Sequence, residues 1–405
     1  MKNIFLSFQH LLSMFGATVL VPVLTNFDPS VALFCAGLGT LIFHLCTKGK
    51  VPVFLGSSFA FIPVVILATQ NANGDIAYAQ GGIVVAGLIY VIMSFVIKFV
   101  GVDKIKRYFP SQVTGAMITV IGLNLIPTAI DMASSNFFVA IAILIIILCI
   151  NLFCKGFFKQ IGILAGIGIG YVISIFLNQV DLTLITQATV FQIPKFSFPN
   201  FDLESIIIIA PIVITVFMEH IGDMTTNGAV VGKNFMEDPG LNMTLLGDGL
   251  ATMVSGFIGG PANTTYGENT AVLAITKNYN PMLLRLTSIY AILLSCIGVF
   301  GAFLQSIPSF VMGGVSIMLF SMISYIGIKT MKDSECLNKN KNNLIIIFSI
   351  IIIGIGTSYM AEKGIVIGIP ITENISITGL SLSAIVGIVL NRIINHKEFK
   401  KVVNN

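Results

Sequence analysis

Four acidic side chains lie inside apolar stretches of the chain, where a charged group is unusual: Glu219, Asp223, Asp248 and Glu268. A carboxylate at hydrocarbon depth costs roughly 3 kcal/mol and normally marks a substrate or proton path. Glu219 and Asp223 are four residues apart and so share one helical face, where burial and mutual repulsion favour a proton on at least one of them. We expect Glu219, Asp223 and Glu268 to carry proton coupling. For Asp223 and Asp248 the alternative, that they hold helix ends or backbone groups together, stays open.

The composition excludes a water-soluble enzyme. Of 405 residues, 55% are hydrophobic and 10% are charged, whereas soluble domains carry about 25% charged residues. The apolar runs are as long as a hydrocarbon slab about 30 Å thick requires of helices. The net charge of +4 includes no basic patch of the kind that binds nucleic acid, and the six cysteines have no metal-ligand spacing. We therefore expect a polytopic membrane protein with no cofactor, no metal and no nucleic-acid partner.

Fourteen apolar segments are expected to be membrane-spanning helices. The first seven lie near residues 9–25, 30–46, 59–70, 80–100, 110–130, 136–153 and 160–178, and the second seven near 203–224, 243–259, 267–276, 281–304, 308–326, 344–359 and 375–395. Because seven is odd, the second half enters the membrane from the opposite side. The predicted fold is an all-α polytopic membrane protein built from two inverted seven-helix repeats, as in many secondary carriers.

The distribution of basic residues supports this topology. If both termini are cytoplasmic, all of the 22 Lys and Arg residues except Lys195 and Lys363 fall on the cytoplasmic side, as the positive-inside rule requires. We expect a multi-pass protein of the cell membrane with both termini in the cytoplasm.

The third segment of each half is too short to cross as a helix alone. Residues 59–70 would span only about 18 Å, and the β-prone stretch 51–58 before them contains Pro52 and Gly56. In the second half, the stretch 259–268 leads into a helix that meets Lys277 after a similar length. We expect the two extended stretches to pair, with their helices pointing N-terminal N–H groups at one central pocket. The alternative is that they are loops joining ordinary short helices.

Five short motifs stand out along the chain: QHL at 9–11, MFGATVLVP at 14–22, LGSSFAF at 55–61, EHIG at 219–222 and PANTTYGEN at 261–269. They resemble motifs of the nucleobase-ascorbate transporter family (nucleobase:cation symporter 2), and most closely those of its uracil permease branch. The last two together are highly specific, and the resemblance covers nearly the whole chain. It implies a core domain from residues 9–100 and 203–304, a gate domain from 108–178 and 308–395, and a linker at 179–202. It also suggests a homodimer.

The resemblance further implies a substrate site in the core domain, facing the gate. The carboxylates of Glu219 and Glu268 would accept hydrogen bonds from ring N–H groups. The backbone N–H groups of Phe59 and Gly267 would bind carbonyl oxygens, and the side chains of Ala17 and Tyr266 would shape a flat slot. Uracil is planar and neutral, with two ring N–H donors and two carbonyl acceptors, and it complements such a set.

Two positions depart from the uracil branch. Asp223 stands where that branch commonly has His and purine-carrying relatives often have Asp, and Ala271 replaces a usual glycine. The purine branch, however, usually has Gln where this chain has Glu268. We therefore expect uracil import by proton symport with alternating access, and xanthine or uric acid as the alternative substrate. A sodium-coupled version has less support, because no cage of oxygen ligands beyond the same acids is visible.

Two rivals from other classes have less support. For an intramembrane enzyme, no metalloprotease or nucleophile-elbow motif is present. For an anion exchanger or channel of the same architecture, Glu219 and Glu268 have the wrong sign of charge. The expected partners are a nucleobase, a proton and the lipid bilayer.

Overall fold

The structure, a computed structural model, describes residues 2–333, 341–371 and 376–395. The described residues leave out parts of the predicted gate range, namely 334–340 and 372–375. The last predicted span begins at residue 375, which is among them. Four of the basic residues assigned to the cytoplasmic side also lie outside the described residues: Lys339, Lys397, Lys400 and Lys401.

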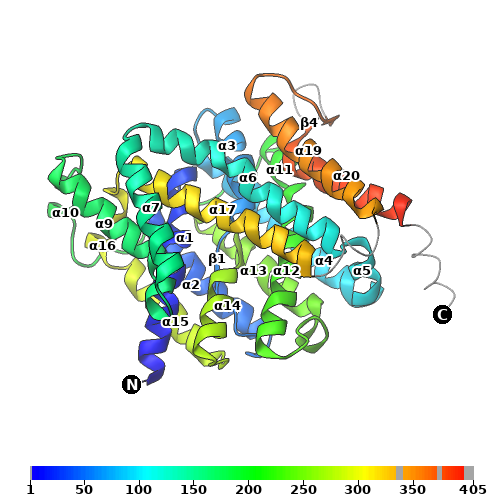
Figure 1. The fold of residues 1–405 in the computed structure, drawn as a ribbon, viewed down its shortest axis with the longest axis horizontal. Coiled ribbons are helices and arrows are strands. Elements are labelled where there is room, and N and C mark those ends of the chain that lie inside the picture. Colours follow the sequence, from blue (N-terminus) through cyan, green and yellow to red (C-terminus); the bar gives the residue numbers. More distant parts are fainter. Residues whose placement is uncertain (1, 334–340, 372–375, 396–405) are drawn as a thin grey trace.

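The molecule is mostly helical (Figure 1). The first half contains α1 (Lys2–Thr25), α2 (Pro29–Cys46), α3 (Ile62–Asn71), α4 (Ile76–Val100), α5 (Val102–Tyr108), α6 (Ser111–Ser134), α7 (Phe137–Phe153), α8 (Phe157–Gln160), α9 (Gly162–Phe176) and α10 (Thr183–Thr186). The second half contains α11 (Leu203–Ile209), α12 (Ile212–Val231), η2 (Met236–Gly240), α13 (Leu241–Phe257), α14 (Gly267–Thr276), α15 (Met282–Ser295), α16 (Gly298–Gln305), α17 (Ser309–Asp333), α19 (Asn342–Glu362) and α20 (Gly379–Ile394).

Each predicted helical stretch coincides with one helix or with two consecutive helices. Seven helical stretches in the described part of the chain are long and apolar enough to span a membrane, with α11 and α12 counted as one, and five shorter apolar stretches of 10–17 residues accompany them. Two predicted spans are interrupted. The stretch 203–224 breaks between α11 and α12 at Pro211, which has no N–H to continue the helical ladder. The stretch 281–304 breaks between α15 and α16, where Ile297 forms a β-bridge with Phe191.

The predicted pairing of two extended stretches is confirmed. Strand β1 (Leu55–Ser57) runs antiparallel to β2 (Asn263–Thr265), with Gly56 opposite Thr264, and both strands are buried. Backbone hydrogen bonds extend the ladder at both ends, from Ser58 N to the Ala262 carbonyl (2.8 Å) and from Tyr266 N to the Phe54 carbonyl (3.1 Å). Because the strands satisfy each other, their peptide groups can lie deep in the protein without water.

A second antiparallel pair joins β3 (Ile369–Pro370) to β4 (Ser376–Ile377). It lies at the outer end of α19 and α20, far from the first pair (Figure 1). Sequence reasoning did not foresee it, because strands of two residues leave no periodic pattern.

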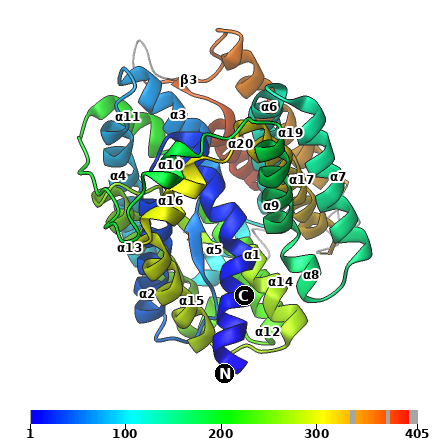
Figure 2. The same ribbon diagram turned by 90° about the vertical axis from the view of Figure 1, so that its left-hand side faces the viewer.

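The helices pack in two groups (Figure 2). In one, α13 packs against α4 and α2, and α2 packs against α15; in the other, α17 packs against α6 and α7, and α19 against α6 and α20. Helices α1 and α12 each contact both groups, and α14 contacts α1 and α12. Glycine allows the closest approach: a Cβ on Gly87 of α4 would lie 2.8 Å from the Gly249 carbonyl oxygen of α13.

The stretch 179–202 joins the two halves and follows the first group of helices. Its backbone N–H groups donate to the Cys296 carbonyl from Gln192 (2.9 Å) and to the Ala77 carbonyl from Asn200 (2.9 Å). These bonds attach residues 192 and 200 to the end of α15 and the start of α4.

Candidate functional site

The four acids predicted from the sequence meet in one region. Glu219 and Asp223 lie on α12, Asp248 lies on α13 and Glu268 lies in the first turn of α14. Their negative charges act on one another: Glu219 interacts electrostatically with Asp248 and Glu268, and Asp223 interacts with all three. Asp248 is buried, whereas the other three are partly exposed. Asp248 is therefore enclosed by the protein, whereas the residues Glu219, Asp223 and Glu268 are enclosed only in part.

Two helices begin beside these acids. The short 3-10 helix Phe59–Phe61, continuous with α3, follows β1, and α14 follows β2 at Gly267. Neither preceding residue, Ser58 or Tyr266, caps its helix with a side-chain hydrogen bond to the described chain. Since the first N–H groups of a helix have no intrahelical acceptor, both helix starts present donors and positive dipole ends. At Gly267 a Cβ would meet no described heavy atom within 4 Å, so the space there is open.

Aromatic rings form one wall of the region. The rings of Phe59 and Tyr266 are nearly parallel, 10° apart with centroids at 6.3 Å, and Phe320 of α17 stands edge-on to Phe59 at 5.9 Å. The Tyr266 hydroxyl donates to the Ser57 carbonyl at 3.0 Å. The ring lies directly over Gly56, where any Cβ would overlap it. The absence of a side chain at residue 56 therefore lets Tyr266 take this position.

Ala17 and Asp223 lie against the same strand pair. Ala17 is buried on α1, and the neighbouring Thr18 carbonyl accepts a bond from Ser57 Oγ at 3.4 Å. Asp223 Oδ2 accepts a hydrogen bond from Thr265 Oγ1 at 2.9 Å, which ties α12 to β2. The structure thus brings Ala17, Phe59, Tyr266 and Gly267 together with the acids, through β1 and β2.

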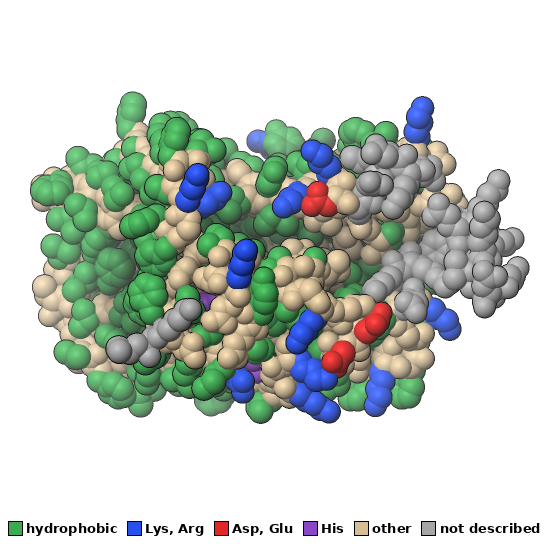
Figure 3. Space-filling model, turned by 60° about the horizontal axis from the view of Figure 1, so that its bottom comes forward, with side chains coloured by type: hydrophobic (Ala, Val, Ile, Leu, Met, Phe, Trp, Pro, Cys, Tyr) green, Lys and Arg blue, Asp and Glu red, His purple; other side chains and the backbone are tan. Residues whose placement is uncertain are grey.

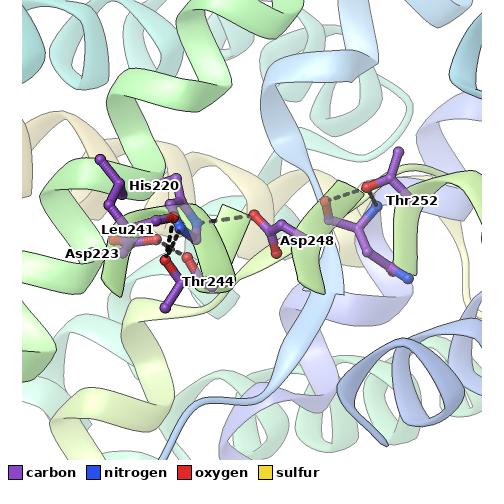
Figure 4. Close-up of polar contacts among 8 residues, drawn as sticks. His220, Asp223, Leu241, Thr244, Asp248 and Thr252 are labelled. Atoms are coloured by element: carbon purple, nitrogen blue, oxygen red, sulfur yellow. Dashed lines mark hydrogen bonds and ion pairs between the residues drawn. The ribbon is translucent and has the colours of Figure 1, made fainter. Parts of the chain in front are cut away.

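Of the three buried histidines, His10 and His220 contact neighbouring helices. His10 Nδ1 lies 3.0 Å from Asn269 Oδ1, joining α1 to α14. His220 lies between Asp248 and Thr244 of α13, with Nδ1 at 3.0 Å from Asp248 Oδ2 and Nε2 at 2.9 Å from Thr244 Oγ1 (Figure 4). Sequence reasoning missed Thr244, although its spacing of four from Asp248 places the two on one face of a helix.

A cavity of about 640 Å³ lies further along α12. Ile221, Gly222 and Thr225 of α12 line it, together with Thr114 of α6 and Thr330 of α17. The four acids do not line this cavity, but Gly222 is adjacent to Asp223 on the same helix. The cavity therefore approaches the acids from between the two groups of helices.

Comparison with known proteins defines the family. Residues 1–363 match the family model described as "Permease family", which is named for xanthine and uracil permeases. The chain belongs to this family. The resemblance to nucleobase-ascorbate transporters is thereby confirmed. Members of the family are named permeases, so the protein is a multi-pass membrane transporter rather than an enzyme.

Curated relatives match over nearly their whole length. A probable uracil permease of Haemophilus influenzae is 38% identical over 403 residues, covering 97% of this chain and 94% of the relative. The uracil permease of Bacillus caldolyticus is 40% identical, covering 96% and 91%. That of Escherichia coli K12 is 38% identical, covering 97% and 91%.

Solved structures share the permease's fold at low sequence identity. SLC26A9 has a TM-score of 0.73 at 10% identity, covering 97% of this chain and 64% of the SLC26A9 chain. The transmembrane domain of the cyanobacterial bicarbonate transporter BicA has a TM-score of 0.65 at 14% identity, covering 89% and 96%. These similarities concern the fold alone, since one fold hosts many functions.

Proposed function

We propose that this permease imports uracil by proton symport across the cell membrane, with both termini in the cytoplasm. The observation that carries the proposal is the meeting of Glu219 and Glu268 with the two helix starts at Phe59 and Gly267. Relatives named uracil permeases, at 38–40% identity, support the choice of substrate.

The site complements a pyrimidine ring. Glu219 and Glu268 accept the two ring N–H bonds, and the backbone N–H groups of Phe59 and Gly267 donate to the two carbonyl oxygens. Tyr266 and Phe59, together with Ala17, shape a flat slot. The open space at Gly267 supports this placement, and so does Glu219 Oε2, which has no hydrogen-bond partner within the described ranges. A site built from hydrogen bonds rejects rings that lack the matching donors.

The transport cycle rests on two moving units. We assign residues 9–100 and 203–304 to a core domain and 108–178 and 308–395 to a gate domain, in fourteen segments that form two inverted repeats. The two packing groups of Figure 2 and the antiparallel pairing of the two third segments support this division. The cavity between α12 and α6 supports an inward-open state. Lys233 lines it, and the proposed topology places Lys233 on the cytoplasmic side. Lys and Arg side chains gather on the face of the molecule shown in Figure 3.

Proton coupling follows from the crowding of charge. Glu219, Asp223 and Glu268 repel one another in a site sheltered from water, so binding a proton there favours holding a neutral ring. The alternative substrate is a purine, xanthine or uric acid, and Asp223 is the residue that favours it.

Competition of labelled uracil uptake tests the proposal. In cells without their own nucleobase carriers, unlabelled uracil should compete and cytosine should not, and xanthine competition would favour the alternative. Glu219→Gln and Glu268→Gln should each abolish uptake, whereas Glu237→Gln, an exposed acid on η2, should leave it unchanged. Accumulation that survives an uncoupler would disprove proton symport.

A further inference from the structure

A buried histidine–aspartate pair lies behind the carboxylate of Glu219. His220 is 0% exposed and Asp248 is 1% exposed, with Nδ1 and Oδ2 3.0 Å apart. Because His220 follows Glu219 on α12, the two side chains point about 100° apart around the helix. His220 is directed toward Asp248 and Thr244 of α13 (Figure 4).

The Thr244 hydroxyl can serve this pair in two ways. Its oxygen lies 2.9 Å from His220 Nε2 and 3.0 Å from the Leu241 carbonyl oxygen. A hydroxyl has one hydrogen, so it donates to only one of these acceptors at a time. When it donates to Leu241, its lone pair accepts a bond from a protonated Nε2. When it donates to His220, Nε2 carries no hydrogen.

These two arrangements differ by one proton. In the first, both ring nitrogens of His220 carry a proton, with Nε2–H facing Thr244, and the ionised Asp248 lies 3.0 Å from Nδ1, so that the pair is electrically neutral overall. In the second, only the proton facing Asp248 remains and the pair carries one negative charge. Rotation of one hydroxyl converts the hydrogen-bond pattern, and no heavy atom has to move.

Buried polar atoms in and beside the pair have no hydrogen-bond partner within the described ranges. One is His220 Nδ1, which lies at ion-pair distance from Asp248 without a hydrogen bond to it. The others are Asp248 Oδ1, Glu219 Oε2 and the Tyr90 hydroxyl of α4, and the charges of Asp248 and Glu219 both act on Tyr90. Unpaired buried oxygens are costly, and excess negative charge raises that cost. A proton held by the pair lowers the negative charge of this region.

The ionisable groups on the surrounding elements leave the pair as a distinct location for a proton. They are Tyr90 on α4, Glu219 and Asp223 on α12, Glu268 on α14, His44 on α2, which bonds the Val53 carbonyl at 2.9 Å, and the exposed Glu237 and Asp238 on η2. Asp223 already accepts a hydrogen bond from Thr265 Oγ1. In the proposed site, Glu219 and Glu268 are needed as acceptors for the ring N–H groups. A protonated Glu219 would lose part of its capacity to accept such a bond.

We propose that the His220–Asp248 pair binds the coupling proton, with Thr244 as the positioning residue that accommodates both protonation states. This inference rests on the proposed proton symport and refines it: the proton that offsets the repulsion among Glu219, Asp223 and Glu268 is held by the pair and not by one of these three acids. Glu219 then stays ionised and accepts the substrate N–H while the pair is loaded. Proton binding forms one N–H bond on the imidazole and breaks none within the protein.

Calorimetry of uracil binding in buffers of different ionisation enthalpy counts the protons taken up. Wild type should take up about one proton per uracil over a range of pH. Thr244→Val should still bind uracil, but the midpoint of its proton uptake should move about one unit to lower pH, a tenfold loss of proton affinity, because the charged N–H loses its acceptor. Thr244→Ser should restore the wild-type profile.

The outcomes separate this inference from the proposed function. If wild type takes up a proton and both Thr244→Val and Asp248→Asn do so with an unchanged profile, the pair is not the proton site, and proton symport still stands. Wild type that binds uracil without proton uptake would overturn both. Should the variants not fold, nitrogen-15 spectra of wild-type protein labelled at its four histidines decide: uracil should turn one singly protonated buried ring into a doubly protonated one, and unchanged rings would overturn the inference.

Discussion

The substitution Gly267→Ala tests the position of the substrate with little disturbance of the protein. Gly267 is the first residue of α14, and an added Cβ would meet no described heavy atom within 4 Å. Alanine is also the better helix former, by up to about 1 kcal/mol. The folded protein should therefore be as stable as wild type, or slightly more stable.

Substrate binding should respond differently, because the methyl group would occupy the space in which we propose that the ring sits. Crowding a well-packed contact by one carbon costs about 1–3 kcal/mol. That range corresponds to a dissociation constant for uracil that is about 5- to 150-fold higher. The Michaelis constant for uracil uptake should rise within this range, while the melting temperature stays unchanged.

The measurement pairs uptake in proteoliposomes with thermal unfolding in detergent. Gly168→Ala on α9 is the matched control, because a Cβ there also meets no described heavy atom within 4 Å, and it should change neither quantity. Unchanged uracil affinity in Gly267→Ala would refute the placement of the ring at this helix start. A large drop in the melting temperature of Gly267→Ala would refute the conclusion that the space beside Gly267 is open.

Three other substitutions probe the surroundings of the site. Gly56→Ala should lower stability by about 1–3 kcal/mol and impair uptake, since its Cβ would overlap the Tyr266 ring; a wild-type melting curve would contradict the ring's position. Thr265→Val removes the donor to Asp223 and should lower the free energy of unfolding by about 1–3 kcal/mol. Thr265→Ser keeps the donor and should not lower it. Equal melting temperatures for the two variants would show that this hydrogen bond contributes nothing to stability. Asn269→Ala removes the buried amide between α14 and α1 and should lower the melting temperature by a similar free energy, with an unaltered melt as the contrary result.

Much of the site could be predicted from residue type and spacing. Acids in apolar stretches are costly, so Glu219 and Glu268 are conspicuous from their sequence surroundings alone. The short third segments, with Pro52 and Gly56 before one of them, indicated that extended chain had to complete the crossing. The pairing then followed, because buried peptide groups need partners.

Other features depend on packing between distant helices and left no local pattern. The contact of His220 with Thr244 and Asp248 requires the particular rotation of α12 against α13. The edge-on contact of Phe320 with Phe59 joins segments that are more than 250 residues apart. The interruption at Pro211 was readable in principle, since proline removes a helical donor, but the apolar run continued through it.

The strand pair has a consequence for biosynthesis. The partners Leu55 and Thr265 are separated by 210 residues of translation, which takes about 10–40 s at ordinary ribosome speeds. During that interval the peptide groups of β1 have no sheet partner, and lipid cannot supply one. We therefore expect β1 to reach its final position only after β2 has been made, even though Thr40 of α2 can already accept a hydrogen bond from the Leu55 N–H.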